Sequence, residues 1–399
     1  MNRQLLNGEV QAYISEHMQA DVHTIAMAKS PFDGISAAEL ANQIAARKKS
    51  RRKLPTWFGT EGIYYPTLLS VEQCSSETTA AYKASLSIGG SLIDLTGGFG
   101  VDSYYFAGSN SSVIHCEINP GLSEIAAYNA TLLGQKNTEF YSGDGLGLLQ
   151  QHKKEFGTIY IDPARRSNVG KVFMLKDCTP DVVSNLDLLL GHAKRLLIKT
   201  APLLDLTAGL KELKQVREIH IVSVKNECKE LIWLLERGYE GETTIVCTTL
   251  NHEQKQLRFL MADEKTLSGG TAAAEEEPIL PGAYLYEPDV ALLKGGAFNL
   301  IAQHYTLQKL HAQTQLYVSD KIDSSFPGRI FRVEAVLTTA TIKKEKNLLG
   351  SVVVRNYPDK AASLVEKYRI KPDEVKFLIF TRNMAQGKII LESTIIQHY

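Results

Sequence analysis

The feature that most constrains the fold is a regular alternation of short apolar runs with helical stretches from residue 91 onward. Seven runs have the length and the apolar, β-branched composition of strands: SLIDL, SVIHCEI, TEFYS, GTIYID, KRLLIK, EIHIVSV and TTIVCTTL. Between them lie segments with helical periodicity: PGLSEIAAYNATLLG, TPDVVSNLDLLLGHA, LDLTAGLKELKQ and NECKELIWLLERG. Such alternation predicts the α/β class, with a doubly wound, mainly parallel sheet of seven strands that helices cover on both faces.

The flanking segments divide the 399 residues into four expected parts. Residues 1–85 have helical periodicity, and residues 86–262 hold the alternating strands and helices. Residues 263–281 are polar and small, as is typical of a linker. Residues 282–399 carry further strand-like runs (RIFRVEAVL, LGSVVVRN, VKFLIFTR and KIILEST) and predict a smaller C-terminal α/β domain.

Composition narrows the class of protein. No apolar run reaches the ~18–20 residues of a membrane span, and the first residues lack the apolar core of a signal peptide. We therefore expect a cytoplasmic protein without a membrane partner. The five cysteines form no CxxC pair and the ten histidines form no HxxxH pair, so we expect neither a disulfide framework nor a metal.

A glycine-rich turn, LIDLTGGFGVD, follows the first strand and predicts a ligand site at the carboxyl end of the sheet. The turn consists of Thr96, Gly97, Gly98, Phe99 and Gly100. It contains neither the GK[ST] of a phosphate loop nor the G-x-G-x-x-G spacing of a dinucleotide site. Asp94 precedes the turn and Asp102 follows it, and two carboxylates favour a ligand with a cationic amino group over a phosphate.

Two further acids follow the next strands and indicate what that ligand is. Glu117 ends the second strand, 23 residues after Asp94, where a carboxylate can accept hydrogen bonds from both ribose hydroxyls. Asp144 follows the third strand, where it can accept a hydrogen bond from an adenine amino group. A nucleoside with a charged amino-acid arm is S-adenosylmethionine. Taken singly, these features have ordinary interpretations: a common turn, a solvated strand end at Glu117 and a helix cap at Asp144.

The fourth strand ends at Asp162-Pro163, within GTIYIDPARRSNVGKV, beside the expected position of the transferred methyl group. There a carboxylate and backbone carbonyls can bind a nucleophilic amine and take its proton, and Pro163 fixes the chain so that carbonyls face the site. Arg165 and Arg166 are candidates to bind a phosphate or carboxylate of the substrate. The alternative is that Asp162 and Pro163 only turn the strand, with both arginines paired to surface acids.

In this order, DLTGGFGVD, CEINP, SGDG and IDPARR resemble the class I S-adenosylmethionine-dependent methyltransferases, and more narrowly a bacterial group with a THUMP-like C-terminal domain. The pattern of that group also covers RRKLPTW, LSVEQCSSETTAAYK, SVKNECKELIWL, YEPD, YVSD and FRVEAVL, so the resemblance spans most of the chain. It implies a methyltransferase with a small ferredoxin-like or THUMP-like C-terminal domain. The motif around Glu117 is also similar to RNA-cap trimethylguanosine synthases.

The resemblance also implies which residues bind the cofactor. Its motifs place cofactor contacts at the ends of the four strands and in the glycine turn: Asp94, Thr96, Gly97, Gly98, Phe99, Gly100, Glu117, Asp144 and Asp162. It further implies that Ser76 and Thr78, in SSETTA, lie by the methionine arm.

The chain departs from the family pattern at the fourth strand. Methyltransferases that act on exocyclic amines usually carry an aromatic residue after the prolines of this motif, whereas this chain reads DPAR and lacks that stacking surface. Methyltransferases that act on carbon 5 of a pyrimidine use a cysteine nucleophile. The nearby candidate is Cys178, in KDCTPD, a pattern more typical of a loop before a helix.

A structured RNA is the expected partner. A basic run precedes Trp57 and Phe58, so cations lie beside stacking groups. The run comprises Arg47, Lys48, Lys49, Arg51, Arg52 and Lys53. Residues 283–399 hold 16 basic and 11 acidic residues, with Lys343, Lys344 and Lys346 clustered and Arg355 nearby. The alternative for such a run is a solvated helix face.

The sequence thus predicts an S-adenosylmethionine-dependent methyltransferase that modifies a base nitrogen of a structured RNA, either tRNA or rRNA. Two alternatives stay open. One is a methyltransferase that acts on a protein or a small molecule, which would lack the steep salt dependence that phosphate contacts give to RNA binding. The other is a non-catalytic RNA-binding module that retains the cofactor fold, which would bind the cofactor without turnover.

Overall fold

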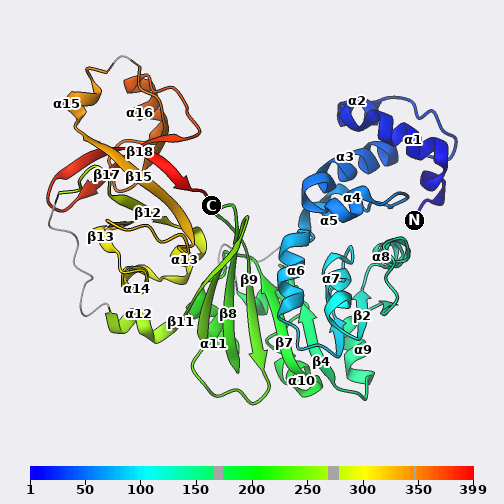
Figure 1. Cartoon of the computed structure of the whole chain (residues 1–399). Coiled ribbons are helices and arrows are strands. Elements are labelled where there is room, and N and C mark those ends of the chain that lie inside the picture. The colour runs from blue at the N-terminus through cyan, green and yellow to red at the C-terminus, as the bar shows by residue number, and fades with distance from the viewer. Residues whose placement is uncertain (166–173, 268–277, 346) are drawn as a thin grey trace. The chain divides into compact units, whose positions relative to one another are not determined.

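The computed structural model describes residues 1–165, 174–267, 278–345 and 347–399 (Figure 1). The described chain forms two compact units, the first made of residues 1–217 and 232–241 and the second of residues 218–231 and 242–399. The predicted domain boundaries at residues 85, 262 and 281 stay predictions. None of the helices in the described ranges has the length and apolarity needed to span a membrane.

Residues 1–85 fold into short helices, as their periodicity predicts. The helices are η1 (Arg3–Leu6), α1 (Gly8–Glu16), η2 (His17–Gln19), α2 (Val22–Met27), α3 (Ala37–Lys53), α4 (Pro55–Gly59), α5 (Leu68–Gln73) and α6 (Glu77–Ser85). A capping box begins α3: the Ser36 hydroxyl accepts a hydrogen bond from the Glu39 amide, and the Glu39 carboxylate accepts one from the Ser36 amide. Pro55 occupies the first position of α4, where its missing N–H has no cost.

The described residues form a large sheet of nine strands in the order β11-β10-β8-β9-β7-β4-β1-β2-β3. The strands are β1 (Ser91–Asp94), β2 (Ser112–Glu117), β3 (Thr138–Ser142), β4 (Phe156–Ile161), β7 (Ala193–Thr200), β8 (Val216–Val224), β9 (Glu227–Glu236), β10 (Thr244–Leu250) and β11 (Gln254–Leu260). Parallel pairs join β3 to β2, β2 to β1, β1 to β4 and β4 to β7. The chain starts at β1, builds outward to β3 and returns to the other side of β1. The carboxyl ends of β1 and β4 therefore mark a topological switch point, where α/β sheets bind ligands.

The connections between these strands are mostly helical, and the predicted α/β class is confirmed. The helices are α7 (Val101–Ser109), α8 (Pro120–Leu132), α9 (Gly145–Gln151), α10 (Leu186–His192) and α11 (Leu206–Glu212). A short ribbon of β5 (Ala164–Arg165) and β6 (Cys178–Thr179), with η3 (Leu175–Asp177), follows β4.

The prediction of a helix at NECKELIWLLERG is wrong, because these residues form β9. Lys225 and Asn226 before it have positive φ angles of 51° and 58°, the geometry of the two-residue turn that joins neighbouring strands of a hairpin. Five consecutive residues, 231–235, are buried, which suits a strand covered on both faces. A continuous apolar run of this length fits either a buried strand or a helix, so the periodicity misled the prediction. With β9 and the antiparallel β11, the sheet has nine strands rather than the predicted seven.

The second unit contains a separate sheet of seven strands in the order β13-β14-β12-β15-β18-β17-β16 within the described residues. Its elements are β12 (Tyr284–Pro288), α13 (Val290–Gly295), α14 (Phe298–His304), β13 (Gln308–His311), β14 (Thr314–Ser319), β15 (Gly328–Leu337), α15 (Thr339–Ile342), β16 (Ser351–Val354), α16 (Ala361–Tyr368), β17 (Lys376–Asn383) and β18 (Gly387–Gln397). The sheet is antiparallel except between β16 and β17. Leu285, Phe331 and Ile379 are fully buried in its core.

The first part of the predicted linker is helical. Residues of α12 (Met261–Leu267) include Glu264, whose carboxylate accepts hydrogen bonds from the amides of Asn299 and Leu300 at the start of α14. This side chain therefore caps α14, a contact with a segment more than thirty residues away that composition does not indicate. Residues 268–277 lie outside the described residues.

Candidate functional site

The glycine turn lies between β1 and α7 and is fixed to the neighbouring strand. The Gly97 amide donates a hydrogen bond to the Cys116 carbonyl at 2.7 Å, and the Gly98 amide donates one to Glu117 Oε2 at 3.0 Å. Gly98 and Gly100 have φ angles of 57° and 85°, which favour glycine. The turn is therefore held at the carboxyl ends of β1 and β2, where a ligand can approach its backbone.

A buried histidine under the turn explains why residue 97 must be glycine. A Cβ atom at Gly97 would lie 2.2 Å from Nε2 of His115. The His115 ring is fully buried and packs against Phe140, with ring centroids 4.9 Å apart. Burial lowers the pKa of His115 to about 4, so the ring is neutral near pH 7. The turn rests on an uncharged ring that leaves no room for a side chain.

The carboxyl ends of β2 and β3 carry the two predicted nucleoside-binding acids. Glu117 Oε1 accepts a hydrogen bond from the Asn119 amide at 2.7 Å, and the Glu117 carbonyl accepts one from the Gly143 amide at 2.9 Å. Asp144 is exposed and caps α9, as its Oδ1 accepts a hydrogen bond from the Leu146 amide at 3.1 Å. The helix cap proposed as the alternative for Asp144 is thus present, and both acids lie at the edge of the sheet by the turn.

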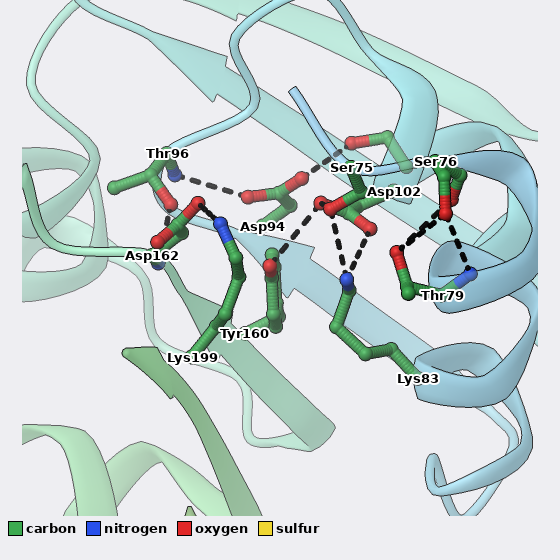
Figure 2. Close-up of polar contacts among 11 residues, drawn as sticks. Ser75, Ser76, Thr79, Lys83, Asp94, Thr96, Asp102, Tyr160, Asp162 and Lys199 are labelled. Carbon is green, nitrogen blue, oxygen red and sulfur yellow. Dashed lines mark hydrogen bonds and ion pairs between the residues drawn. The ribbon is translucent and has the colours of Figure 1, made fainter. Parts of the chain in front are cut away.

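Asp94, at the end of β1, supports the turn from within the protein. Its side chain is fully buried. Its Oδ1 accepts a hydrogen bond from the Thr96 amide at 3.0 Å (Figure 2). Its Oδ2 accepts one from the Ser103 hydroxyl at 2.7 Å. Burial raises the pKa of Asp94 to about 7. Its contacts in this structure are structural, joining β1 to the turn and to α7.

Asp102, which follows the turn, forms a buried ion pair. Lys83 Nζ lies 3.1 Å from Asp102 Oδ1, and the Lys83 side chain is fully buried. Asp102 Oδ2 accepts hydrogen bonds from the Ser75 hydroxyl at 2.8 Å and from the Tyr160 hydroxyl at 3.2 Å (Figure 2). The Lys83 ammonium also donates to the Ser75 hydroxyl at 2.8 Å. The segment before β1, the start of α7 and β4 are therefore tied together through one carboxylate.

The remaining predicted cofactor residues occupy three different environments. Ser76 caps α6, where its hydroxyl accepts a hydrogen bond from the Thr79 amide at 3.2 Å, and Thr78 is exposed on that helix. Phe99 is buried in the N-terminal core, with its ring centroid 6.3 Å from that of Trp57. The Phe99 side chain thus anchors the turn to the helical region. The role of these residues in cofactor binding stays a prediction.

The end of β4 is joined to the same turn. The Asp162 amide donates a hydrogen bond to the Thr96 hydroxyl at 2.7 Å. Asp162 Oδ2 forms an ion pair with Lys199 Nζ, on the adjacent strand β7, at 2.5 Å (Figure 2). Pro163 is buried and Arg165 lies in β5, whereas Arg166 lies outside the described residues. Cys178 is fully buried in β6, and its thiol donates to the Met174 carbonyl at 3.6 Å.

Lys199, Lys83 and Ser75 are site residues that the sequence analysis missed. Lys199 comes near the end of the strand-like run KRLLIKT, and a charge after three apolar positions at the carboxyl end of a parallel strand was an available signal. Ser75 and Lys83 carry no such signal, because their partner Asp102 is distant in sequence. An apolar residue, Ile118, follows Glu117 and is 74% exposed, where a base could pack.

The basic run of α3 is not one uniform surface. Lys53 Nζ donates hydrogen bonds to the carbonyls of Val71 at 3.0 Å and Glu72 at 2.6 Å. Burial lowers the pKa of Lys53, the nearby Cys74 thiol opposes this, and the charge of Lys199 lowers the pKa further. The charges of Lys53 and Lys199 therefore repel each other. Other members of the run reach partners too, as Lys49 pairs with Glu72 and Arg47 lies over the Phe58 ring, while Arg51 and Arg52 are exposed.

Comparisons with known proteins support the classification of this protein as a methyltransferase. A family profile described as a ferredoxin-like domain matches residues 284–327, which confirms that part of the C-terminal prediction. No curated protein matches the chain. A crystal structure from Porphyromonas gingivalis W83, of a protein provisionally classed as a methyltransferase, is similar over 100% of both chains, with 28% identity and a TM-score of 0.84.

Two further solved structures resemble a smaller part of the chain. One is an rRNA methylase from Streptococcus thermophilus, with 16% identity and a TM-score of 0.30, which covers 40% of this chain and 93% of its own. The other is a protein from Streptococcus mutans, provisionally classed as a methyltransferase and in complex with SAH. It has 11% identity and a TM-score of 0.30, and it covers 40% of this chain and 96% of its own.

Proposed function

We propose that this protein is an S-adenosylmethionine-dependent methyltransferase that modifies a base nitrogen of a structured RNA. The observation that carries the proposal is the attachment of the glycine turn at two points. The Gly98 amide binds Glu117, and the Thr96 hydroxyl binds the Asp162 backbone. These contacts hold Glu117 and Asp162 on either side of one turn at the switch point of the sheet, which supports the proposed roles of Glu117 toward the nucleoside and of Asp162 toward the methyl acceptor.

The residues present fit such a cofactor. Gly98 has open space where a Cβ would be, with no atom nearer than 3.9 Å, so a ligand can approach the backbone. Glu117 and Asp144 supply carboxylates for the ribose hydroxyls and the adenine amino group, and the exposed Ile118 side chain supplies an apolar surface for the base. When bound, S-adenosylmethionine supplies a methyl group that its sulfonium already activates.

The protein contributes position and proton acceptance. The Asp162 carboxylate, at the end of β4, would accept a hydrogen bond from the acceptor nitrogen and take its proton. Asp94 and Asp102 would support the glycine turn rather than contact the substrate, because their carboxylate oxygens already accept hydrogen bonds within the protein. The donors are Thr96 and Ser103 for Asp94, and Ser75 and Tyr160 for Asp102. Holding the reacting groups in this arrangement is the larger part of such catalysis.

The proposal of an RNA partner rests on the distribution of basic residues rather than on the fold. Arg51 and Arg52 are exposed on α3, and residues 283–399 carry 16 basic against 11 acidic residues. Arg165 and Arg166 follow Asp162 by three and four residues and would bind a substrate phosphate. A methyltransferase that acts on a protein or a small molecule, and an RNA-binding module without turnover, are the competing functions.

The test uses tritiated S-adenosylmethionine with RNA, protein and metabolite pools from a strain that lacks the gene. We expect label in one RNA size class with the wild type and none with Asp162→Ala. Asp187→Ala is a matched control, since Asp187 is an exposed acid on α10. Label in protein or metabolites would contradict the RNA substrate. Binding of the cofactor without transfer of label to any pool would contradict the proposed methyltransferase activity.

A further inference from the structure

Asp162 is paired with a cation at the position where the methyl acceptor is expected. Lys199 Nζ lies 2.5 Å from Asp162 Oδ2, and the two side chains are 15% and 32% exposed. The residues come from the carboxyl ends of the paired strands β4 and β7. The pair is partly shielded from water, so each charge strongly affects any group that binds beside it.

The net charge of the side chains around Asp162 determines whether a neutral or a cationic methyl acceptor binds more favourably. Asp102, the neighbouring acid, is neutralised by Lys83 at 3.1 Å, and Lys199 neutralises Asp162 in the same way. Asp94, with a pKa of about 7, is partly ionised near pH 7, and Lys53, whose pKa is lowered first by burial and also by the charge of Lys199, adds a cation that offsets this charge. The acceptor end of the site therefore carries no net negative charge.

We propose that Lys199 is a specificity-determining residue, which pairs with Asp162 and thereby selects a neutral acceptor nitrogen over a cationic one. The inference rests on the proposed function, because it assumes that the cofactor binds at the glycine turn and the acceptor binds at Asp162. Lys199 acts through Asp162. It holds Oδ2, so that the other carboxylate oxygen is directed to the acceptor, and it cancels the charge that would attract an ammonium group.

This arrangement favours a nucleobase over a protein side chain. Most base nitrogens are neutral near pH 7, whereas lysine and arginine side chains carry a positive charge. An uncompensated carboxylate would bind those cations, as acids do throughout proteins. With Lys199 in place, a cationic acceptor would meet an ammonium group within a few ångströms, which costs binding free energy in a partly buried site. A neutral nitrogen can still donate a hydrogen bond to Asp162.

Two cofactor analogues test the inference without knowledge of the substrate. S-Adenosylhomocysteine carries a neutral thioether, and sinefungin carries a protonated amine where the cofactor carries its methylated sulfur. The ratio of their dissociation constants, measured by titration calorimetry, therefore reports the charge at the acceptor end. We expect Lys199→Met to increase the affinity for sinefungin relative to the affinity for S-adenosylhomocysteine by about tenfold. This is the effect expected of one nearby charge that has lost its counter-ion.

Further variants separate charge from structure. Asp162→Asn removes the carboxylate charge beside Lys199, so the ratio should shift by about tenfold in the opposite direction. Lys199→Arg keeps the cation and should keep the wild-type ratio, as should the double variant Lys199→Met with Asp162→Asn. Lys194→Met is the matched control, because Lys194 is an exposed lysine at the opposite end of the same strand. Thermal unfolding of each variant shows whether it is folded.

The outcomes distinguish the inference from the proposed function. If both analogues bind and the ratio moves in opposite directions in the two single variants, Lys199 sets the charge preference. If both analogues bind to every folded variant with the same ratio of dissociation constants, the inference about Lys199 is wrong, whereas the proposed cofactor site is still supported. If neither analogue binds to the wild-type protein, the proposed function fails and the inference fails with it.

Discussion

Replacing Gly97 by alanine should destabilise the first unit, for a reason that is purely steric. The new Cβ would lie 2.2, 2.3 and 2.6 Å from three atoms of the His115 ring, far inside van der Waals contact. The ring is fully buried against Phe140 and has no free space to enter. Forcing one extra methyl group into such a core costs ~1–3 kcal/mol, which lowers the melting temperature by ~2–4 °C for each kcal/mol in a unit of this size.

Urea unfolding followed by tryptophan fluorescence is a suitable assay. Both tryptophans of the chain, Trp57 and Trp233, are buried in the first unit, so their emission reports that unit. Gly108→Ala is the matched control. It lies on α7, a Cβ there meets nothing within 4 Å, and alanine should stabilise an exposed helical position by ~0.5–1 kcal/mol.

A double-variant cycle decides whether the histidine ring is the cause. His115→Ala removes the obstructing atoms, so Gly97→Ala should cost little in that background. We expect a favourable coupling free energy of ~1–2 kcal/mol between the two substitutions. Equal costs of Gly97→Ala in both backgrounds, or no cost in the wild type, would refute the reasoning.

Substitutions centred on three residues, Asp94, Lys83 and Thr96, test the polar contacts around the turn. The pKa of Asp94 is about 7 in the folded protein and 3.8 for an unperturbed aspartate, so its stabilising contribution is full below pH 3.8 and is lost as pH rises through 7. Asp94→Asn should abolish this fall in stability toward urea. Lys83→Met should cost ~3–5 kcal/mol because Asp102 loses its cation, and Lys83→Met with Asp102→Asn should recover most of that loss in the same assay. Thr96→Val should cost ~1–3 kcal/mol because the Asp162 amide loses its acceptor, whereas Thr96→Ser should not; equal melting temperatures for the two would contradict this.

Local pattern was enough to predict the strands around the switch point. β1, β2 and β4 are short, mainly apolar runs and β3 is a short run with two aromatic residues, each bounded by turn residues, and a parallel sheet brings the carboxyl ends of such runs to one edge. The positions of Asp94, Glu117, Asp144 and Asp162 follow from that rule. β9 was the failure, because a strand buried on both faces has lost the alternation that distinguishes it from a helix.

The partners of the site residues could not be predicted in the same way. The sequence places Asp94 and Asp102 beside a cationic ligand, but the folded chain supplies Ser103 to one and Lys83 to the other. Lys83 comes from α6, a helix that precedes the sheet, and no spacing rule joins it to α7. Pairings between elements distant in sequence depend on tertiary packing, which a single sequence reveals only in part.

The discontinuous composition of the two units has a consequence for synthesis and for proteolysis. The chain passes from one unit to the other after residues 217, 231 and 241, and β9 contributes to both. During translation, residues 218–231 leave the ribosome before residues 232–241, so the first unit waits for its last strand while part of the other is already exposed. A single cut after residue 241 would therefore leave residues 218–231 of the second unit attached to the first, and a fragment that starts at residue 282 would lack β10 and β11. Exchange of one unit between related chains would need three coordinated junctions rather than one.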